Sequence, residues 1–112
     1  MTSGVGSGIV NTSDMTNYLE VIVEINKDVL KAHALLKLVE LYGMQYMQSK
    51  IKDCWHGVHD AGAYCRFVYL FEGSKGESKN IADKKGWKVY AIIDVDKSTF
   101  ATTVVESVLP NQ

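Results

Sequence analysis

The chain has 112 residues, of which 46% are hydrophobic, and a formal net charge of -1. This length fits one compact domain with one core and leaves no room for a second. No apolar run approaches the roughly 20 residues that cross a bilayer, and between residues 44 and 85 seven basic side chains face five acidic ones, a small excess for phosphate binding. We therefore predict a soluble protein with neither a membrane nor a nucleic-acid partner.

The N-terminal segment differs in composition from the rest. Residues 1–14 are mostly Gly, Ser, Thr, Val and Asn, with too little contiguous apolar surface to offset the entropy of ordering them. We predict a flexible tail over 1–14 and a single domain over 15–112. The segment lacks the charged start and apolar centre of a secretion signal, and Cys54 and Cys65 are the only cysteines. We therefore expect a cytoplasmic protein with reduced thiols.

An alternating segment comes next in the chain. Tyr18–Ile25 places Leu19, Val21 and Val23 on one face and Tyr18, Glu20 and Ile22 on the other, which predicts a half-buried strand. Asn26 can then cap a helix over 27–42, whose apolar arc is wide enough to be buried on more than one side. Gly43 offers a left-handed stop to that helix.

The segment Met44–Trp55 is open to two interpretations. Met44, Met47, Ile51 and Cys54 lie three or four residues apart, which favours a second helix. A strand here would instead produce the order strand, helix, strand, strand, helix, strand, which is the ferredoxin-like plan.

The second half of the chain contains two clear strands. His56–Ala63 has two glycines and predicts a connection. Tyr64–Glu72 is rich in aromatic and β-branched residues and predicts a strand. A polar loop follows over residues 73–86, and Trp87–Val95 alternates as a strand that returns antiparallel beside Tyr64–Glu72.

The C-terminal segment favours a last helix. Phe100, Val104 and Val108 fall on one helical face, Asp96 or Ser98 can supply the cap, and Pro110 ends the segment. Threonines at positions 99, 102 and 103 weaken this prediction, because β-branched side chains lose freedom in a helix.

Together these elements predict an α+β fold, in which a small and mainly antiparallel sheet carries two or three helices on one face. The opposite face of the predicted sheet still shows five apolar side chains: Ile22, Val68, Leu70, Tyr90 and Ile92. A monomer rarely exposes that much apolar area. We therefore expect a homodimer, formed through this face or through the helix over 27–42.

One cluster has the residue types of a metal site. Cys54, His56, His59 and Cys65 offer the thiolate and imidazole groups that zinc prefers. The gaps of one, two and five residues between them do not match the usual spacing of structural zinc sites, so a histidine-bearing loop beside two buried thiols remains the alternative. A thiolate and imidazole pair for covalent catalysis lacks a marked third group.

No motif in the sequence identifies a reaction, which favours a non-enzymatic role. The leading hypothesis is a binding or interaction module whose small-molecule or protein ligand contacts exposed aromatic side chains, for which the candidates are Trp55, Tyr64, Tyr69 and Trp87. No cofactor is expected under this hypothesis. The alternatives are a zinc protein or small enzyme centred on the Cys/His cluster, and an inhibitor or immunity-type protein that blocks a partner.

Overall fold

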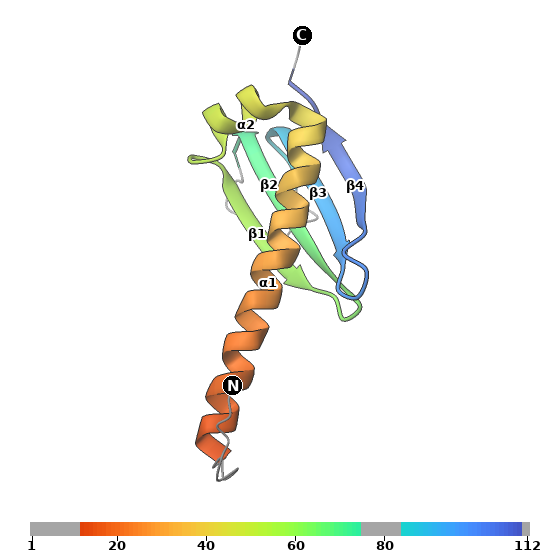
Figure 1. The fold of residues 1–112 in the computed structure, drawn as a ribbon. Coiled ribbons are helices and arrows are strands. Elements are labelled where there is room, and N and C mark those ends of the chain that lie inside the picture. Colours follow the sequence, from red (N-terminus) through yellow and green to blue (C-terminus); the bar gives the residue numbers. More distant parts are fainter. Residues whose placement is uncertain (1–11, 75–83, 111–112) are drawn as a thin grey trace.

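The computed structural model describes residues 12–74 and 84–110, and these form two helices followed by four strands (Figure 1). The elements in chain order are α1 Thr12–Tyr42, α2 Met44–Lys50, β1 Trp55–Asp60, β2 Tyr64–Gly73, β3 Trp87–Asp96 and β4 Thr102–Val108. The strands form one antiparallel sheet in the order β1-β2-β3-β4, and α1 crosses one face of it. The predicted α+β class with an antiparallel sheet and helices on one face is confirmed.

The C-terminal half of α1 forms the core with the sheet. Leu30, Ala34 and Leu38 recur every four residues, so they share one face of the helix, and all three are buried. On the facing side of the sheet, they meet buried residues of β2 and β3: Cys65, Phe67, Tyr69, Ala91, Ile93 and Val95. Burial of this helical row fixes where α1 lies on the sheet.

Gly43 ends α1 as the sequence predicts. Its φ is 89°, a left-handed conformation that favours glycine, and its N–H donates to the carbonyl of Val39 at 2.8 Å. The Gly43 carbonyl then accepts from the N–H of Met47 at 3.1 Å, which starts α2. The predicted helix from Met44 is therefore confirmed, although it ends at Lys50 rather than Trp55.

The two strands predicted in the second half are also confirmed. β2 and β3 pair antiparallel, with Phe67 opposite Ile93 and Val68 opposite Ile92. Both are central strands of the sheet, which explains why both of their faces are apolar.

The prediction of a strand over Tyr18–Ile25 is wrong, because these residues belong to α1. Their alternating apolar residues also satisfy a second period, since Tyr18, Ile22 and Val29 are four and seven residues apart. Once Leu30 to Leu38 are fixed as helix against the sheet, extending that helix toward its N-terminus needs no new nucleus. Helix propagation therefore overrides the β-branched composition. The predicted tail lies outside the described residues except for residues 12–14, with which α1 begins.

His56–Ala63 is not a simple connection, because it contains most of β1. The turn to β2 covers residues 61–63, where Gly62 has a φ of 92° and its N–H donates to Oδ1 of Asp60 at 2.9 Å. Gly57 and Asp60 disfavour a strand by composition, but pairing with β2 from Cys65 to Leu70 supplies the hydrogen bonds that form one.

The predicted C-terminal helix is also wrong, because residues 102–108 form β4 beside β3. Asp96 does not cap a helix. Its Oδ1 accepts from the N–H groups of Ser98 and Thr99, at 2.7 and 2.9 Å, and this closes a turn between the strands. The β-branched Thr102, Thr103 and Val104 then suit a strand. The element order αα-ββββ differs from the ferredoxin-like plan, so that alternative is wrong as well.

The sheet face opposite α1 is not the exposed apolar surface that the sequence suggests. Val68, Leu70, Tyr90 and Ile92 are all buried in the single chain, with Trp55 and Trp87 packed against them. Ile22 lies on α1 and not on the sheet. Large apolar side chains that are exposed lie on α1, among them Tyr18, Ile22 and Leu36, and also on the outer strands, at Val58, Val105 and Val108.

Gly62 and Gly73 lie in hairpins, and replacing each by alanine tests what the backbone requires at that position. At Gly73 (φ 117°), an added Cβ would lie 2.4 Å from the carbonyl oxygen of Gly86 and 2.8 Å from the amide nitrogen of Lys88, whereas at Gly62 nothing lies within 4 Å. We expect Gly62→Ala to lower the free energy of unfolding by about 1–2 kcal/mol, from backbone strain alone. We expect Gly73→Ala to lower it by about 3 kcal/mol or more, because overpacking adds to the strain. Urea denaturation measures both values, and equal losses would contradict this description of the β2–β3 hairpin.

Tyr42 should contribute a pH-dependent part of the stability. Its hydroxyl donates to the carbonyls of Tyr90 at 2.7 Å and Val108 at 3.1 Å, and burial raises its pKa to about 12. Because the unfolded chain releases this proton near pH 10 and the folded chain does not, stability is complete below pH 10 and falls as the pH rises from 10 through 12. We expect Tyr42→Phe to flatten the decline in the free energy of unfolding over pH 10–12. An unchanged slope in chemical denaturation would contradict this role.

Candidate interaction surface

The N-terminal part of α1 extends beyond the sheet (Figure 1). A helix of 31 residues is about 46 Å long, and among residues 18–22 and 26–42 of α1, whose burial is described, the first buried one is Leu30. The projecting part makes the molecule long, with principal dimensions of 63 × 30 × 24 Å. An isolated helix is marginally stable in water, and most helical stability in proteins comes from packing of an apolar face.

A row of apolar side chains runs along α1 on the side away from the sheet. We name it the outer seam, and it comprises Tyr18, Ile22, Val29, Ala32 and Leu36. Tyr18 is 68% exposed, Leu36 61% and Ile22 41%. Their steps of four, seven, three and four residues follow a heptad repeat, and the intervening position, 25, is Ile in the sequence.

The outer seam and the sheet-facing row lie on opposite sides of the helix. With 3.6 residues per turn, the centre of the seam is about 160° from that of Leu30, Ala34 and Leu38. The only other helix of the described residues, α2, has seven residues and follows the C-terminal end of α1. The core therefore uses one face of α1 and leaves the other face uncovered.

Polar residues mark the edges of the outer seam. Asn26, Asp28 and His33 occupy the positions beside it, and the ring of His33 stacks on Phe100 at 5.1 Å. Past Leu36, the surface turns polar with an ion pair of 3.3 Å between Lys37 and Glu40. The outer seam therefore ends at Leu36, within the part of α1 that packs on the sheet.

The predicted ligand-binding aromatics are divided between two faces of the sheet. On the face opposite α1, Trp55 and Trp87 lie together with ring centroids 5.9 Å apart, and Trp87 meets Tyr90 at 5.4 Å. Tyr69 is in the core on the helix side, where burial raises its pKa to about 12. Tyr64 lies near the other end of β2, with the Arg66 guanidinium 5.8 Å from its ring centroid.

An ion-pair network borders the two tryptophans. Lys84 and the hydroxyl of Tyr90 both donate to the carboxylate of Glu106. These two hydrogen bonds lower the pKa of Glu106, with that of Lys84 first in size. The network joins β4 to β3 and to the segment before β3, on the face of the sheet opposite α1.

The Cys/His cluster does not converge. His56 and His59 are three residues apart on β1 and therefore point to opposite faces. Cys65 is buried in the core, and Cys54 donates its thiol hydrogen to the carbonyl of Ile51 at 3.2 Å, with burial raising its pKa. Both thiols are free. Within residues 12–74 and 84–110, no three His, Cys, Asp or Glu side chains are placed to hold a metal ion.

Comparison with protein-family models, curated proteins and solved structures found no match to this chain. No helix among the described residues is long and apolar enough to cross a membrane. The outer seam was missed by the sequence analysis because strand alternation was assigned to residues 18–25. Its signal was present as the three- and four-residue spacing that continues from Tyr18 to Leu36.

Proposed function

We propose that the protein is a non-enzymatic interaction module in which α1 pairs with α1 of a second copy. The observation that carries this proposal is the outer seam, a heptad row of apolar side chains, exposed except for the half-buried Val29, on a helix whose other face is already buried. The pairing buries the seam and supports the projecting part of α1.

A second copy supplies the matching surface that the seam needs. A heptad seam packs best against another helix of the same repeat, and the described part of this chain offers no second long helix. In heptad notation, Ile22, Val29 and Leu36 occupy a positions, and Tyr18 and Ala32 occupy d positions. The pairing we propose is parallel, with each residue of the seam beside its own counterpart.

Flanking charges support the same orientation. In a parallel pair, Asp28 at a g position lies near His33 at the following e position of the second copy, so an acidic group meets a hydrogen-bond donor. In the antiparallel pair that would bring Tyr18 opposite Leu36, the two copies of Asp28 would lie close to each other and repel. Because the seam points away from the sheet, the two sheets lie on the outer sides of the helix pair.

The energetics favour a reversible dimer. Each copy contributes four large apolar side chains, and burying such side chains gives about 1.5–3 kcal/mol for complete burial. Burial of all eight side chains in the pair contributes roughly 10–15 kcal/mol. This is less than complete burial would give, because part of their surface is already covered in the single chain. Association costs about 4–15 kcal/mol. We therefore expect dissociation constants in the micromolar range rather than an obligate dimer.

Charged substitutions on the seam test the pairing. We expect the wild-type chain at about 100 µM to have twice its monomer mass of 12.5 kDa in sedimentation equilibrium, and Ile22→Glu with Leu36→Glu to have the monomer mass, because two buried carboxylates per copy oppose association. Circular dichroism should also show a loss of helix in the double variant, since the projecting part loses its support.

Lys31→Glu is the matched control. Lys31 is an exposed residue of α1 that lies away from the seam, so the same new charge should leave the dimer intact. A wild-type monomer at 100 µM, or equal dissociation by Lys31→Glu, would refute pairing through this face.

A further inference from the structure

β1 is an edge strand of the sheet, and among the described strands only β2 pairs with it. The two strands pair over six residues of β1 without a register shift. Val58 in the middle of β1 is 63% exposed, and His56 and His59 are also exposed. β1 contains neither lysine nor proline, which are common on edge strands that resist pairing with another chain. Its edge is therefore open to the addition of a strand.

β4, the other edge strand, is protected. The register between β3 and β4 shifts between Ile92 and Ile93, which leaves Val105 as the extra residue of a β-bulge. In addition, the carbonyl of Val108 accepts a hydrogen bond from the hydroxyl of Tyr42. A bulge twists an edge away from regular pairing. Of the two described edges, β1 is therefore the one suited to a new strand.

The register shows which backbone groups of β1 point outward. The N–H of Ala61 donates to the carbonyl of Tyr64 at 2.9 Å, so these two residues form the hydrogen-bonded pair that closes the hairpin. Hydrogen-bonded and non-hydrogen-bonded pairs alternate along antiparallel strands. Counting back from Ala61 along β1, the N–H and carbonyl groups of His56, Val58 and Asp60 point away from β2. These groups can bond to a neighbouring strand without disturbing the sheet.

The projecting part of α1 gives a second indication that the sheet continues past β1. In Figure 1 this part lies on the β1 side of the sheet and not on the β4 side. Leu19 lies eleven residues before Leu30, which is about three helical turns, so both are on the sheet-facing side of α1. Leu30 is 3% exposed but Leu19 is 54% exposed. A strand added to β1 extends the sheet toward Leu19, which the outer seam does not include.

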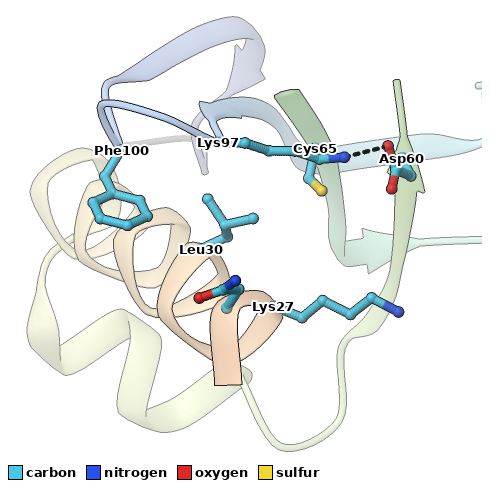
Figure 2. A pocket seen from close by; sticks show the side chains of 7 residues that line it. Lys27, Leu30, Asp60, Cys65, Lys97 and Phe100 are labelled. Carbon is cyan, nitrogen blue, oxygen red and sulfur yellow. Dashed lines mark hydrogen bonds and ion pairs between the residues drawn. The ribbon is translucent and has the colours of Figure 1, made fainter. Parts of the chain in front are cut away.

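The C-terminal end of β1 is held in place by the neighbouring turn (Figure 2). The ammonium group of Lys97 donates to Oδ1 of Asp60 at 2.7 Å, and the Lys97 N–H donates to the carbonyl of Ala63 at 3.0 Å. These bonds border a cavity of about 250 Å³, which lies between the hairpins and α1 at Leu30. Because β1 is already ordered, adding a strand to it costs little conformational entropy.

We propose that β1 pairs antiparallel with β1 of a second copy, which joins the two sheets edge to edge. The pairing is centred on Val58, so that Val58 lies opposite Val58 of the second copy, and His56 lies opposite Asp60 of the second copy. This register lets all three outward-pointing residues form hydrogen bonds with their counterparts. It also places an imidazole opposite a carboxylate and an apolar side chain opposite another, with no like charges opposed.

This contact is separate from the pairing of α1 and weaker than it. None of its residues belongs to the outer seam, so the inference does not depend on the proposed helix pair. A contact of six residues per copy is smaller than a stable interface requires. We expect association through β1 to be at least tenfold weaker than association through the outer seam, so it becomes extensive only near millimolar concentration.

Cysteine cross-linking measures the pairing of β1. The background is the seam variant Ile22→Glu/Leu36→Glu with Cys54→Ser, in which the buried Cys65 is the one remaining native thiol. In this background, Val58→Cys should form covalent dimer at least tenfold faster than Val105→Cys under mild oxidation. Val105 is the matched control, because it is also an exposed valine of an edge strand but lies at the bulge of β4.

His56→Cys in the same background tests the register. Two copies of residue 56 lie about 14 Å apart along the paired strands when the pairing is antiparallel and centred on Val58. A disulfide cannot bridge this distance. We therefore expect His56→Cys to cross-link as slowly as Val105→Cys, although His56 lies on the same edge as Val58.

Val58→Pro tests the hydrogen bonds without a new thiol. Because the N–H of Val58 points away from β2, its loss should leave the fold and the circular dichroism spectrum unchanged. In the seam variant, exchange of the His56 and Asp60 amides should be at least twofold slower at about 1 mM than at about 50 µM, because pairing protects them. Val58→Pro should abolish this concentration dependence.

The proposal is overturned if Val58→Cys cross-links no faster than Val105→Cys, or if His56→Cys cross-links as fast as Val58→Cys. It is also overturned if the outward amides are protected by an added unrelated extended peptide but not by the chain's own concentration, since the edge would then belong to a different partner. Because every measurement uses the seam variant, the expected results support β1 pairing whether or not the wild-type chain pairs through α1.

Discussion

The structure depends on one constraint, which is that α1 is apolar on two sides and the sheet can cover only one of them. Leu30, Ala34 and Leu38 are buried against β2 and β3 and fix the position of the helix. In the outer seam, centred on the opposite side, Tyr18, Ile22, Ala32 and Leu36 are exposed and Val29 is half-buried. The proposed function follows from this division, because the hydrophobic effect that buries one side of α1 against the sheet also favours burial of the outer seam.

The point where α1 leaves the sheet is also where the cavity lies. The buried Leu30 lines this cavity, together with Asn26 and Lys27 of the preceding turn of α1. The hairpins opposite are joined through Lys97 and Asp60.

The sequence predicted the elements whose signals were local and unopposed. Gly43 ended the helix, and β2 and β3 formed where both faces of a strand are apolar. The predictions were wrong where one segment fits both the strand period and the helix period, or where strand pairing overrode an unfavourable composition. The residues from Tyr18 to Ile25 satisfy both a strand and a heptad repeat, and only packing of the following helix decides between them. β1 contains Gly57 and formed because β2 provides an edge to pair with.

The candidate sites were hardly predictable for a related reason. The cavity beside Leu30 combines residues from α1, from the two strands β1 and β2, and from the turn between β3 and β4, so no local spacing in the sequence indicates it. Cys54, His56, His59 and Cys65 are neighbours in sequence, but strand alternation separates them in space. Asp96 was compatible with a helix cap or a turn, since its side chain accepts backbone hydrogen bonds in both, and the β-branched residues after it decided for the turn.

Disulfide cross-linking of Leu36→Cys tests the central claim most directly. In a parallel pair, this residue of the seam lies beside its own counterpart, within the roughly 7 Å between Cα atoms that a disulfide can bridge. In the antiparallel pair with Tyr18 opposite Leu36, the two positions would be about 27 Å apart. If α1 pairs in parallel, Leu36→Cys forms covalent dimer rapidly and almost completely under mild oxidation, whereas Lys31→Cys and the wild-type chain, whose free thiols are buried or half-buried, form little. Cross-linking of Leu36→Cys no faster than that of Lys31→Cys would contradict it.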